Sequence, residues 1–420
     1  MKVAVHTLGC KLNYSESSTI AREFARRGYE VVSSASDADI YVVNTCSVTE
    51  HSDKKDRNLI RRLHRRSPEA VIAVVGCYAQ LKGEEIAALE GVDIVLGAGS
   101  KGLVVDEVEK LLDSRRDGKQ ARKVELCDID SVDNIFPAYS TGERTRSFLK
   151  IQDGCDYKCS YCTVPYARGG SRSLPASTIL EQAREIAQAG IVETVLTGVN
   201  TGDYGRKTGE SFLSLLQQLN DVDGILRYRI SSIEPNLLTP EIVEWIASGT
   251  KFLPHFHIPL QSGCDRILSR MGRRYRTADF RSKIELIRSK MDHVFFGIDV
   301  IVGFPGETEE DFRCTCDFLE EIKPAFIHVF PYSRRAGTPA AVMPDQVPEN
   351  VKTQRVAVLE DMCARLHRDF CAMNSGREEE VLFESKSRDG KMSGYTRNYI
   401  KVEMPYDRNL IGKVVKVILP

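Results

Sequence analysis

The strongest constraint on the fold is the regular alternation of short apolar runs and helical patterns along most of the chain. Helical patterns over residues 15–27 and 52–66 lie between such runs in the first 113 residues. The runs themselves are KVAVHT, IYVVNT, VIAVVG and IVLGA. Strands that alternate with helices form parallel sheets covered on both faces. We therefore predict a doubly wound α/β domain over residues 1–113.

A second series of strand-like runs occupies residues 147–373. Helical patterns over residues 177–189, 239–247 and 308–321 follow or separate them. The runs are SFLKIQ, VETVLTG, ILRYRISS, LPHFHIPL, VFFGIDVIVG and FIHVFPY. Six β/α units favour a partial (β/α)6 barrel, which would carry its active site at the C-terminal ends of its strands.

Two shorter stretches complete the chain. Residues 114–146 are polar with weak periodicity, and we interpret them as a connector. Residues 374–420 hold short strand patterns (EVLFES, MSGYTRNYIKVEM and GKVVKVIL), which predict a small all-β barrel or sandwich. Eight lysines and arginines against four acids between residues 384 and 420 make this last domain basic.

Composition and charge narrow the class of protein. The chain has 420 residues, 28% of them charged, and a formal net charge of -1, which argues against a uniformly basic nucleic-acid binder. It contains neither a signal-peptide pattern nor an apolar run long enough to span a bilayer, so we expect no membrane partner and a cytoplasmic location. Thiols stay reduced there, and the 12 cysteines are expected to be metal ligands or packing residues.

One helical pattern is strongly basic. Seven lysines and arginines with a single acid fall within residues 54–66. This stretch is either a solvated helix face or a contact surface for a polyanion.

The stretch GCDYKCSYC, residues 154–162, places Cys155, Cys159 and Cys162 just after a predicted strand. Protein-only tetrahedral iron or zinc sites use four ligands. Either a distant residue completes a structural site, or an open coordination position serves chemistry. Three thiolates can hold three irons of a four-iron cluster and leave the fourth iron open.

A second cysteine triad is spread along the predicted N-terminal domain. Cys10, Cys46 and Cys77 each come just past the end of a strand. The carboxyl ends of parallel strands meet at one crevice, where ligands bind, so these residues are expected to converge. The alternative is that all three are small buried hydrophobic residues.

The spacing Cys-x3-Cys-x-aromatic-Cys, with Tyr161 as the aromatic residue, resembles the motif of the radical S-adenosylmethionine superfamily. An α/β domain with three strand-end cysteines before this core, and a small β domain after it, resembles the methylthiotransferase family over essentially the whole chain. The resemblance implies S-adenosylmethionine (AdoMet) on the open iron at Cys155, Cys159 and Cys162. It also implies a second [4Fe-4S] cluster at Cys10, Cys46 and Cys77, and an RNA-binding TRAM-like domain over residues 374–420.

The resemblance also suggests which other residues line the cofactor pocket. We expect the loops at the strand ends to do so, with glycines that allow close backbone approach; a tight strand-to-helix turn is the alternative role for Gly303 and Gly306. Glu234 and Glu307 are expected to be hydrogen-bond partners of cofactor or substrate. His257 is expected in the core or at the pocket mouth, and the remaining six cysteines are expected to be structural. The predicted cofactor-binding residues are Tyr161, Gly198, Asn200, Glu234, Gln261, Gly303 and Glu307.

The family resemblance implies a reaction in which a 5′-deoxyadenosyl radical removes hydrogen from an unreactive carbon, which then receives a methylthio group. The opening HTLGCKLNYSES resembles the subgroup that acts on carbon 2 of N6-threonylcarbamoyladenosine beside the tRNA anticodon. A tRNA anticodon stem-loop would suit the basic residues 54–66, Arg334, Arg335 and RRYR at 273–276. An electron donor such as flavodoxin or ferredoxin is expected; the sulfur donor is not indicated.

Three alternatives remain open. The same chemistry could act on isopentenyladenosine in tRNA or on a ribosomal-protein aspartate. A non-catalytic iron-sulfur RNA-binding sensor is the alternative of another class.

Overall fold

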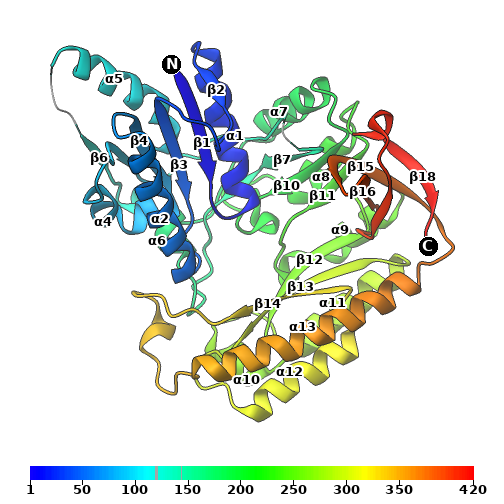
Figure 1. The fold of residues 1–420 in the computed structure, drawn as a ribbon. Helices are drawn as coiled ribbons and strands as arrows, with labels where there is room; N and C mark the ends of the chain where they lie inside the picture. The colour runs from blue at the N-terminus through cyan, green and yellow to red at the C-terminus, as the bar shows by residue number, and fades with distance from the viewer. Residues whose placement is uncertain (119–121, 143) are drawn as a thin grey trace.

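The computed structural model describes residues 1–118, 122–142 and 144–420, without the side chains of residues 385–388. An N-terminal α/β domain lies beside an arc of parallel strands, and a small β domain packs at one end of that arc (Figure 1). No helix within the described ranges is long and apolar enough to cross a membrane.

The N-terminal domain is built on a six-stranded parallel sheet with the order β2-β1-β3-β4-β5-β6. Its strands are β1 (Lys2–Thr7), β2 (Glu30–Val32), β3 (Ile40–Thr45), β4 (Val71–Gly76), β5 (Ile94–Leu96) and β6 (Lys123–Glu125). β6 belongs to the stretch that we interpreted as a connector, so part of residues 114–146 completes the sheet instead. Residues 119–121 and 143 of that stretch lie outside the described residues.

Helices cover both faces of this sheet, as predicted for a doubly wound fold. α1 (Lys11–Arg26) and α5 (Val104–Arg116) pack on one face. α2 (Glu50–Arg66), α3 (Cys77–Leu81) and α4 (Gly83–Ala87) pack on the other. Every residue of β3 and β4 is buried, which explains why these central strands are continuous apolar runs and do not alternate.

The six predicted barrel strands are all present, in two parallel groups ordered β11-β10-β7 and β12-β13-β14. A single bridge between Tyr228 and Phe252 connects the groups into one arc. The strands are β7 (Arg146–Lys150), β10 (Glu193–Thr197), β11 (Arg227–Ile230), β12 (His255–Gln261), β13 (Phe295–Val302) and β14 (Phe326–Pro331). The arc is the expected partial (β/α)6 barrel.

Helices follow the barrel strands on the outside of the arc, and one large core fills the space between them. They are α7 (Ala176–Gln188), α8 (Phe212–Asn220), α9 (Pro240–Ala247), α10 (Asp265–Arg270), α11 (Thr277–Lys290) and α12 (Glu309–Ile322). The helices predicted over residues 177–189, 239–247 and 308–321 correspond to α7, α9 and α12.

The long helix α13 (Glu349–Ala372) packs against β14 and leads to the C-terminal domain. That domain is an antiparallel sheet ordered β17-β16-β15-β18, which confirms the all-β prediction. Its strands are β15 (Glu378–Arg388), β16 (Lys391–Thr396), β17 (Lys401–Pro405) and β18 (Val414–Ile418). Buried Arg229 of β11 donates to the carbonyl oxygens of Thr396 and Arg397, and so fixes this sheet to the barrel.

Candidate functional site

The loop that carries Cys155, Cys159 and Cys162 is closed at its base by two short paired strands, β8 (Gln152–Asp153) and β9 (Arg172–Ser173). Gly154 follows β8 with φ +71°, and a Cβ there would lie 2.0 Å from the carbonyl oxygen of Gly170. Only glycine therefore allows the chain to turn between β8 and the opposing backbone. The turn places all three cysteines beyond the C-terminal end of β7, as predicted.

Gln152 joins this loop to the neighbouring strand end. Its Nε2 donates to the carbonyl oxygen of Gly154 at 2.7 Å, and its Oε1 accepts from the backbone N–H groups of Val199 and Asn200 at 2.9 Å. Buried amide groups that satisfy both their donor and their acceptor atoms hold one geometry. Gln152 is a positioning residue that the strand pattern alone did not single out.

Arg273 connects the cysteine loop to the barrel from the opposite side. This side chain is buried and lies 3.1 Å from Cys159 Sγ, and it also forms an ion pair with Glu234. Our expectation that RRYR at residues 273–276 faces a tRNA is therefore wrong for Arg273, because its charge is used inside the site. Arg274 and Arg276 are exposed.

Tyr161, the aromatic residue of the motif, packs edge-on against Phe304 at 6.5 Å between ring centroids. Its hydroxyl lies 3.4 Å from the Arg273 guanidinium. Burial raises the pKa of Tyr161 well above its ordinary value, so the phenol stays neutral. These contacts pack its ring within the loop, and its expected contact with the cofactor stays a prediction.

The second triad meets at the crevice predicted from its strand-end positions. Cys10 precedes α1, Cys46 follows β3, and Cys77 begins α3. Gly9 has φ +101°, and a Cβ there would lie 2.8 Å from Cys46 Sγ. Glycine at position 9 thus lets the backbone of the Cys10 loop approach Cys46 closely.

The protein surroundings lower the acidity of several thiols in the two triads. Burial raises the pKa of Cys46, Cys155 and Cys162 to about 12 in each case, and the neighbouring cysteines of the same triad add to the effect. The apo thiols are therefore protonated at neutral pH, and binding of a metal would release protons.

The spacing of the thiols indicates the kind of metal centre. Among the described residues, three ligand atoms lie within 4.8 Å of one another only at His257, Asp299 and His328. Neither cysteine triad is that compact, so neither is arranged around a single ion. A multi-iron cluster held by thiolates does not require its sulfurs to lie around one ion.

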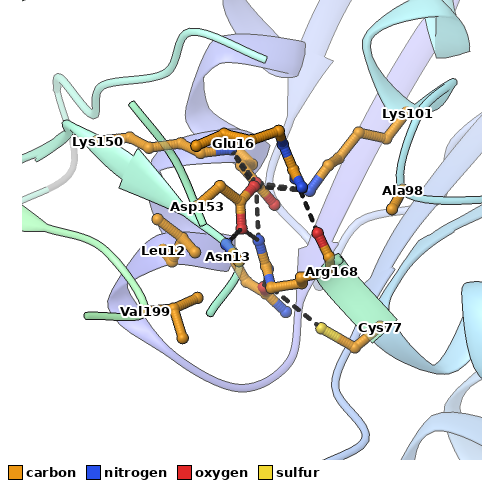
Figure 2. Close-up of polar contacts among 12 residues, drawn as sticks. Leu12, Asn13, Glu16, Cys77, Ala98, Lys101, Lys150, Asp153, Arg168 and Val199 are labelled. Atoms are coloured by element: carbon orange, nitrogen blue, oxygen red, sulfur yellow. Dashed lines mark hydrogen bonds and ion pairs between the residues drawn. The ribbon is translucent and has the colours of Figure 1, made fainter. Parts of the chain in front are cut away.

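Between the triads lies a buried network of charges, shown in Figure 2. Glu16 of α1 is inaccessible to solvent and lies 2.7 Å from both Lys101 and Lys150 Nζ. Asp153 accepts from Lys150 at 2.7 Å and from Arg168 at 2.9 Å. Although burial opposes ionisation, Lys101, Lys150 and Arg168 hold the pKa of Glu16 well below its ordinary range. The network joins the N-terminal domain to the barrel.

Arg168 extends this network to the second triad. It ends α6 (Val164–Arg168), six positions after Cys162. Its Nη2 donates to Asn13 Oδ1 at 2.5 Å, and its Nε lies 3.2 Å from Cys77 Sγ (Figure 2). Each triad therefore has a buried arginine on one of its sulfurs, Arg273 at Cys159 and Arg168 at Cys77.

The strand-end residues carry unpaired donor and acceptor atoms, which fit a polar ligand such as AdoMet. Asn200 is buried, and neither its Oδ1 nor its Nδ2 has a hydrogen-bond partner in the described part of the chain. Ser231 Oγ and Asp203 Oδ2 are orphaned in the same way. Unpaired buried polar groups are costly, and a polar ligand would satisfy them.

Other predicted pocket residues differ in what they contact. Glu307 is buried and pairs with Arg355 at 2.6 Å and with the Gly303 N–H at 2.5 Å, so its role as a cofactor contact lacks support. Gly303 has φ +72° and a Cβ there would meet the Lys352 side chain, in line with the strand-to-helix turn considered as its alternative role. A Cβ at Gly198 would press on Gln152. Gln261 ends β12 with φ 68°.

Arg335, another expected tRNA contact, is buried between the domains. Its Nη2 lies 2.7 Å from both Asp53 Oδ2 and Ser47 Oγ. This expectation is wrong because Asp53 and Ser47 of the N-terminal domain neutralise and cover the guanidinium. Arg334 is exposed.

Comparison with family models divides the chain in three. Residues 149–319 match the Radical SAM superfamily, residues 2–97 match the uncharacterized protein family UPF0004, and residues 373–419 match the TRAM domain. The partial barrel and its three-cysteine loop thus define a radical SAM protein. This superfamily uses AdoMet and a [4Fe-4S] cluster.

Full-length relatives narrow the class. Threonylcarbamoyladenosine tRNA methylthiotransferase MtaB of Bacillus subtilis (strain 168) is 40% identical over 99% of this chain and 93% of its own length. The protein of the same name from Aquifex aeolicus (strain VF5) is 37% identical, with full coverage of both chains. The tRNA-2-methylthio-N(6)-dimethylallyladenosine synthase of Dictyoglomus thermophilum is 36% identical over 99% of this chain and 95% of its own. The chain belongs to the radical SAM methylthiotransferases, a family of enzymes.

Solved structures agree on the fold. The radical S-adenosylmethionine methyltransferase TsrM from Kitasatospora setae, solved with cobalamin and a [4Fe-4S] cluster, covers 93% of this chain and 80% of its own. The TM-score is 0.58 at 16% sequence identity, so the likeness concerns architecture.

Proposed function

We propose that this enzyme adds a methylthio group to carbon 2 of N6-threonylcarbamoyladenosine in the anticodon stem-loop of tRNA. The observation that carries the proposal is full-length similarity, at 37–40% identity, to three enzymes named for that substrate. Enzymes named for dimethylallyladenosine are 31–36% identical. The TRAM match and the basic C-terminal sequence support an RNA substrate.

Two [4Fe-4S] clusters would be held by the cysteines, one by Cys155, Cys159 and Cys162 together with AdoMet, and one by Cys10, Cys46 and Cys77. The first cluster would supply the electron that cleaves AdoMet to the radical needed for C–H activation, and the second would supply the sulfur. A flavodoxin- or ferredoxin-like donor would provide electrons. The orphaned polar atoms of Asn200 and Ser231 support AdoMet binding at the strand ends.

The protein's own side chains position the two cysteine triads relative to the barrel. Gln152 holds the first cysteine loop against the next strand end, while Arg168 and Glu16 hold the second triad against the barrel. The two cysteine triads must keep fixed relative positions, because both centres would act on the same substrate carbon. One cysteine of each triad, Cys159 and Cys46, is buried, which limits the access of water to that sulfur.

The basic face of α2 supports tRNA binding. Lys54, Lys55, Arg61 and Arg62 are exposed on the face opposite the buried residues Leu59 and Leu63. A single-stranded anticodon base can be splayed into a pocket, which a paired base cannot do without cost.

Mass spectrometry of tRNA nucleosides from a strain lacking this gene, beside its parent, tests the proposal. We expect loss of the methylthio form of threonylcarbamoyladenosine and accumulation of its unthiolated precursor. Loss of the methylthio isopentenyl form would instead identify isopentenyladenosine as the substrate. Unchanged tRNA would favour a ribosomal-protein target. Anaerobic incubation with AdoMet and reductant that yields no 5′-deoxyadenosine above the no-enzyme control would favour the sensor alternative.

A further inference from the structure

The lumen of the partial barrel contains a cavity of about 640 Å³, a size typical of small-ligand sites. Every barrel strand contributes at least one residue to its lining, including Phe148, Val195, Arg229, His257, Gly297 and His328. Lys11 enters from the N-terminal domain, directly after Cys10, and Tyr399 closes the cavity from the C-terminal domain. All three domains therefore contribute to the lining of one cavity.

A second cavity of about 710 Å³ is also lined by Lys11. It is lined by Cys10 and Gly9 of the second triad's loop, and it shares Lys11, Arg144 and Phe148 with the first. Lys11 and Arg144 thus stand where the lumen adjoins the Cys10 loop. A group bound between them would lie beside the second triad.

The acids around the lumen already have partners. Asp299 pairs with His257 at 2.6 Å, Glu384 with Arg146 at 2.5 Å, and Glu193 with Arg229 at 2.8 Å. These pairs leave no carboxylate for the remaining cations.

Lys11 and Arg144 are those remaining cations. Across the described ranges, no carboxylate lies within 4.0 Å of either one. The Arg144 guanidinium lies over the Tyr14 ring, 4.4 Å from its centroid, and this contact holds it at the cavity wall. The lumen therefore has an excess of positive charge near Lys11 and Arg144.

The surroundings of Lys11 favour an anionic ligand. Its exposed side chain lines both cavities, so a ligand in either one can reach the ammonium. A cation without a counter-ion can form a charge-assisted hydrogen bond with a bound anion. Aromatic side chains such as Phe148, Phe295 and Phe326 line the rest of the wall.

We propose that Lys11, assisted by Arg144, binds the carboxylate of the substrate's modified adenosine and so selects the threonylcarbamoyl form. This inference rests on the proposed function. The threonyl group carries a carboxylate at neutral pH, whereas an isopentenyl group carries no charge. Recognition by the residue next to Cys10 couples the choice of substrate to placement of its base beside the second triad.

The test compares anticodon stem-loops bearing threonylcarbamoyladenosine as the free acid and as its methyl ester. The ester preserves shape and removes the charge. We expect the wild type to bind the acid about tenfold or more tightly than the ester, the effect of one charge-assisted hydrogen bond. Lys11→Met should bind the acid about as weakly as the ester, and Lys11→Arg should restore the preference. Methylthio product should follow the same order.

Lys2→Met, an exposed lysine at the far end of β1, is the matched control and should behave as wild type. Lys11→Met should bind the ester as tightly as the wild type does, whereas a site damaged by loss of iron would bind the ester more weakly as well. Equal binding of acid and ester by a wild type that converts the acid would overturn the carboxylate site and leave the proposed function standing. Conversion of an isopentenyladenosine stem-loop, but not of the threonylcarbamoyl stem-loop, would overturn both.

Discussion

Arg168 Nε lies 3.2 Å from Cys77 Sγ, so a residue of the radical-cluster loop contacts the other triad. Positive charge and hydrogen bonds at the sulfurs raise the reduction potential of an iron-sulfur cluster. We predict that Arg168→Met shifts the potential of the cluster at Cys10, Cys46 and Cys77 to more negative values. Arg168→Lys, which keeps charge but loses the planar fork, should shift it less.

The measurement is a potentiometric titration followed by EPR, in a background where Cys155, Cys159 and Cys162 are all alanine. In that background only the second cluster contributes a signal. An unchanged potential in Arg168→Met would show that this contact serves packing alone.

Glu16→Gln should strongly destabilise the interface between the N-terminal domain and the barrel. Glu16 is completely buried against Lys101 and Lys150, and removing one member of a buried ion network costs roughly 3–5 kcal/mol. Urea unfolding should show the loss as a lower midpoint. Glu23→Gln, which breaks only exposed pairs with Arg26 and Arg27, is the control and should change the midpoint little. Similar midpoints for both variants would contradict the prediction.

Cys159→Ala should remove one cluster and leave the other. The two triads lie in different domains, each with its own hydrophobic core. We expect about half of the wild-type iron and sulfide, no 5′-deoxyadenosine above background, and retention of the cluster at Cys10, Cys46 and Cys77 by Mössbauer spectroscopy. Loss of all iron would mean that the two sites assemble together.

Replacing Lys54, Lys55, Arg61 and Arg62 by alanine should weaken tRNA binding without affecting AdoMet cleavage. All four are exposed on α2, and no ion pair in the described part of the chain involves them. The slope of log affinity against log salt should fall by about 0.7–0.9 for each lost phosphate contact. Binding measured at several salt concentrations gives this slope. Arg116→Ala on α5 is the control, and an equal effect there would refute a specific surface.

The free energy of unfolding should decrease in mild acid because of His6. Burial, followed by Arg66 and Arg62, lowers its pKa to about 4 from the ordinary 6.5. The folded protein therefore binds fewer protons than the unfolded chain between these values, and stability present above pH 6.5 is lost as the pH falls toward 4. Urea midpoints at pH 7.5, 6 and 5 should decline less steeply for His6→Phe than for the wild type. Parallel declines would rule out His6 as the cause.

Much of the fold was predictable because its signals are local. Each barrel strand is a short apolar run, and Cys10, Cys46, Cys77 and Cys155 stand at strand ends, where parallel topology brings ligands together. The edge strand β6 was missed because it has only three residues and no fully buried position.

The charged interior was not predictable in the same way. Arg273 and Arg335 lie in basic, polar sequence, and only tertiary partners show that they are buried. Glu16 contacts Lys101 and Lys150 across 85 and 134 residues of chain, and no local pattern links such positions. Gln152 and Arg168 were overlooked for the same reason.

The charge network around Glu16 also limits how this enzyme can be recombined. Glu16 and Lys101 come from the N-terminal domain, while Lys150, Asp153 and Arg168 come from the barrel. A chimera that exchanged one domain for a relative's would bury an unbalanced charge unless the matching residues travelled with it. The two domains are therefore expected to be inherited as one unit, and their junction is a poor place to divide the gene.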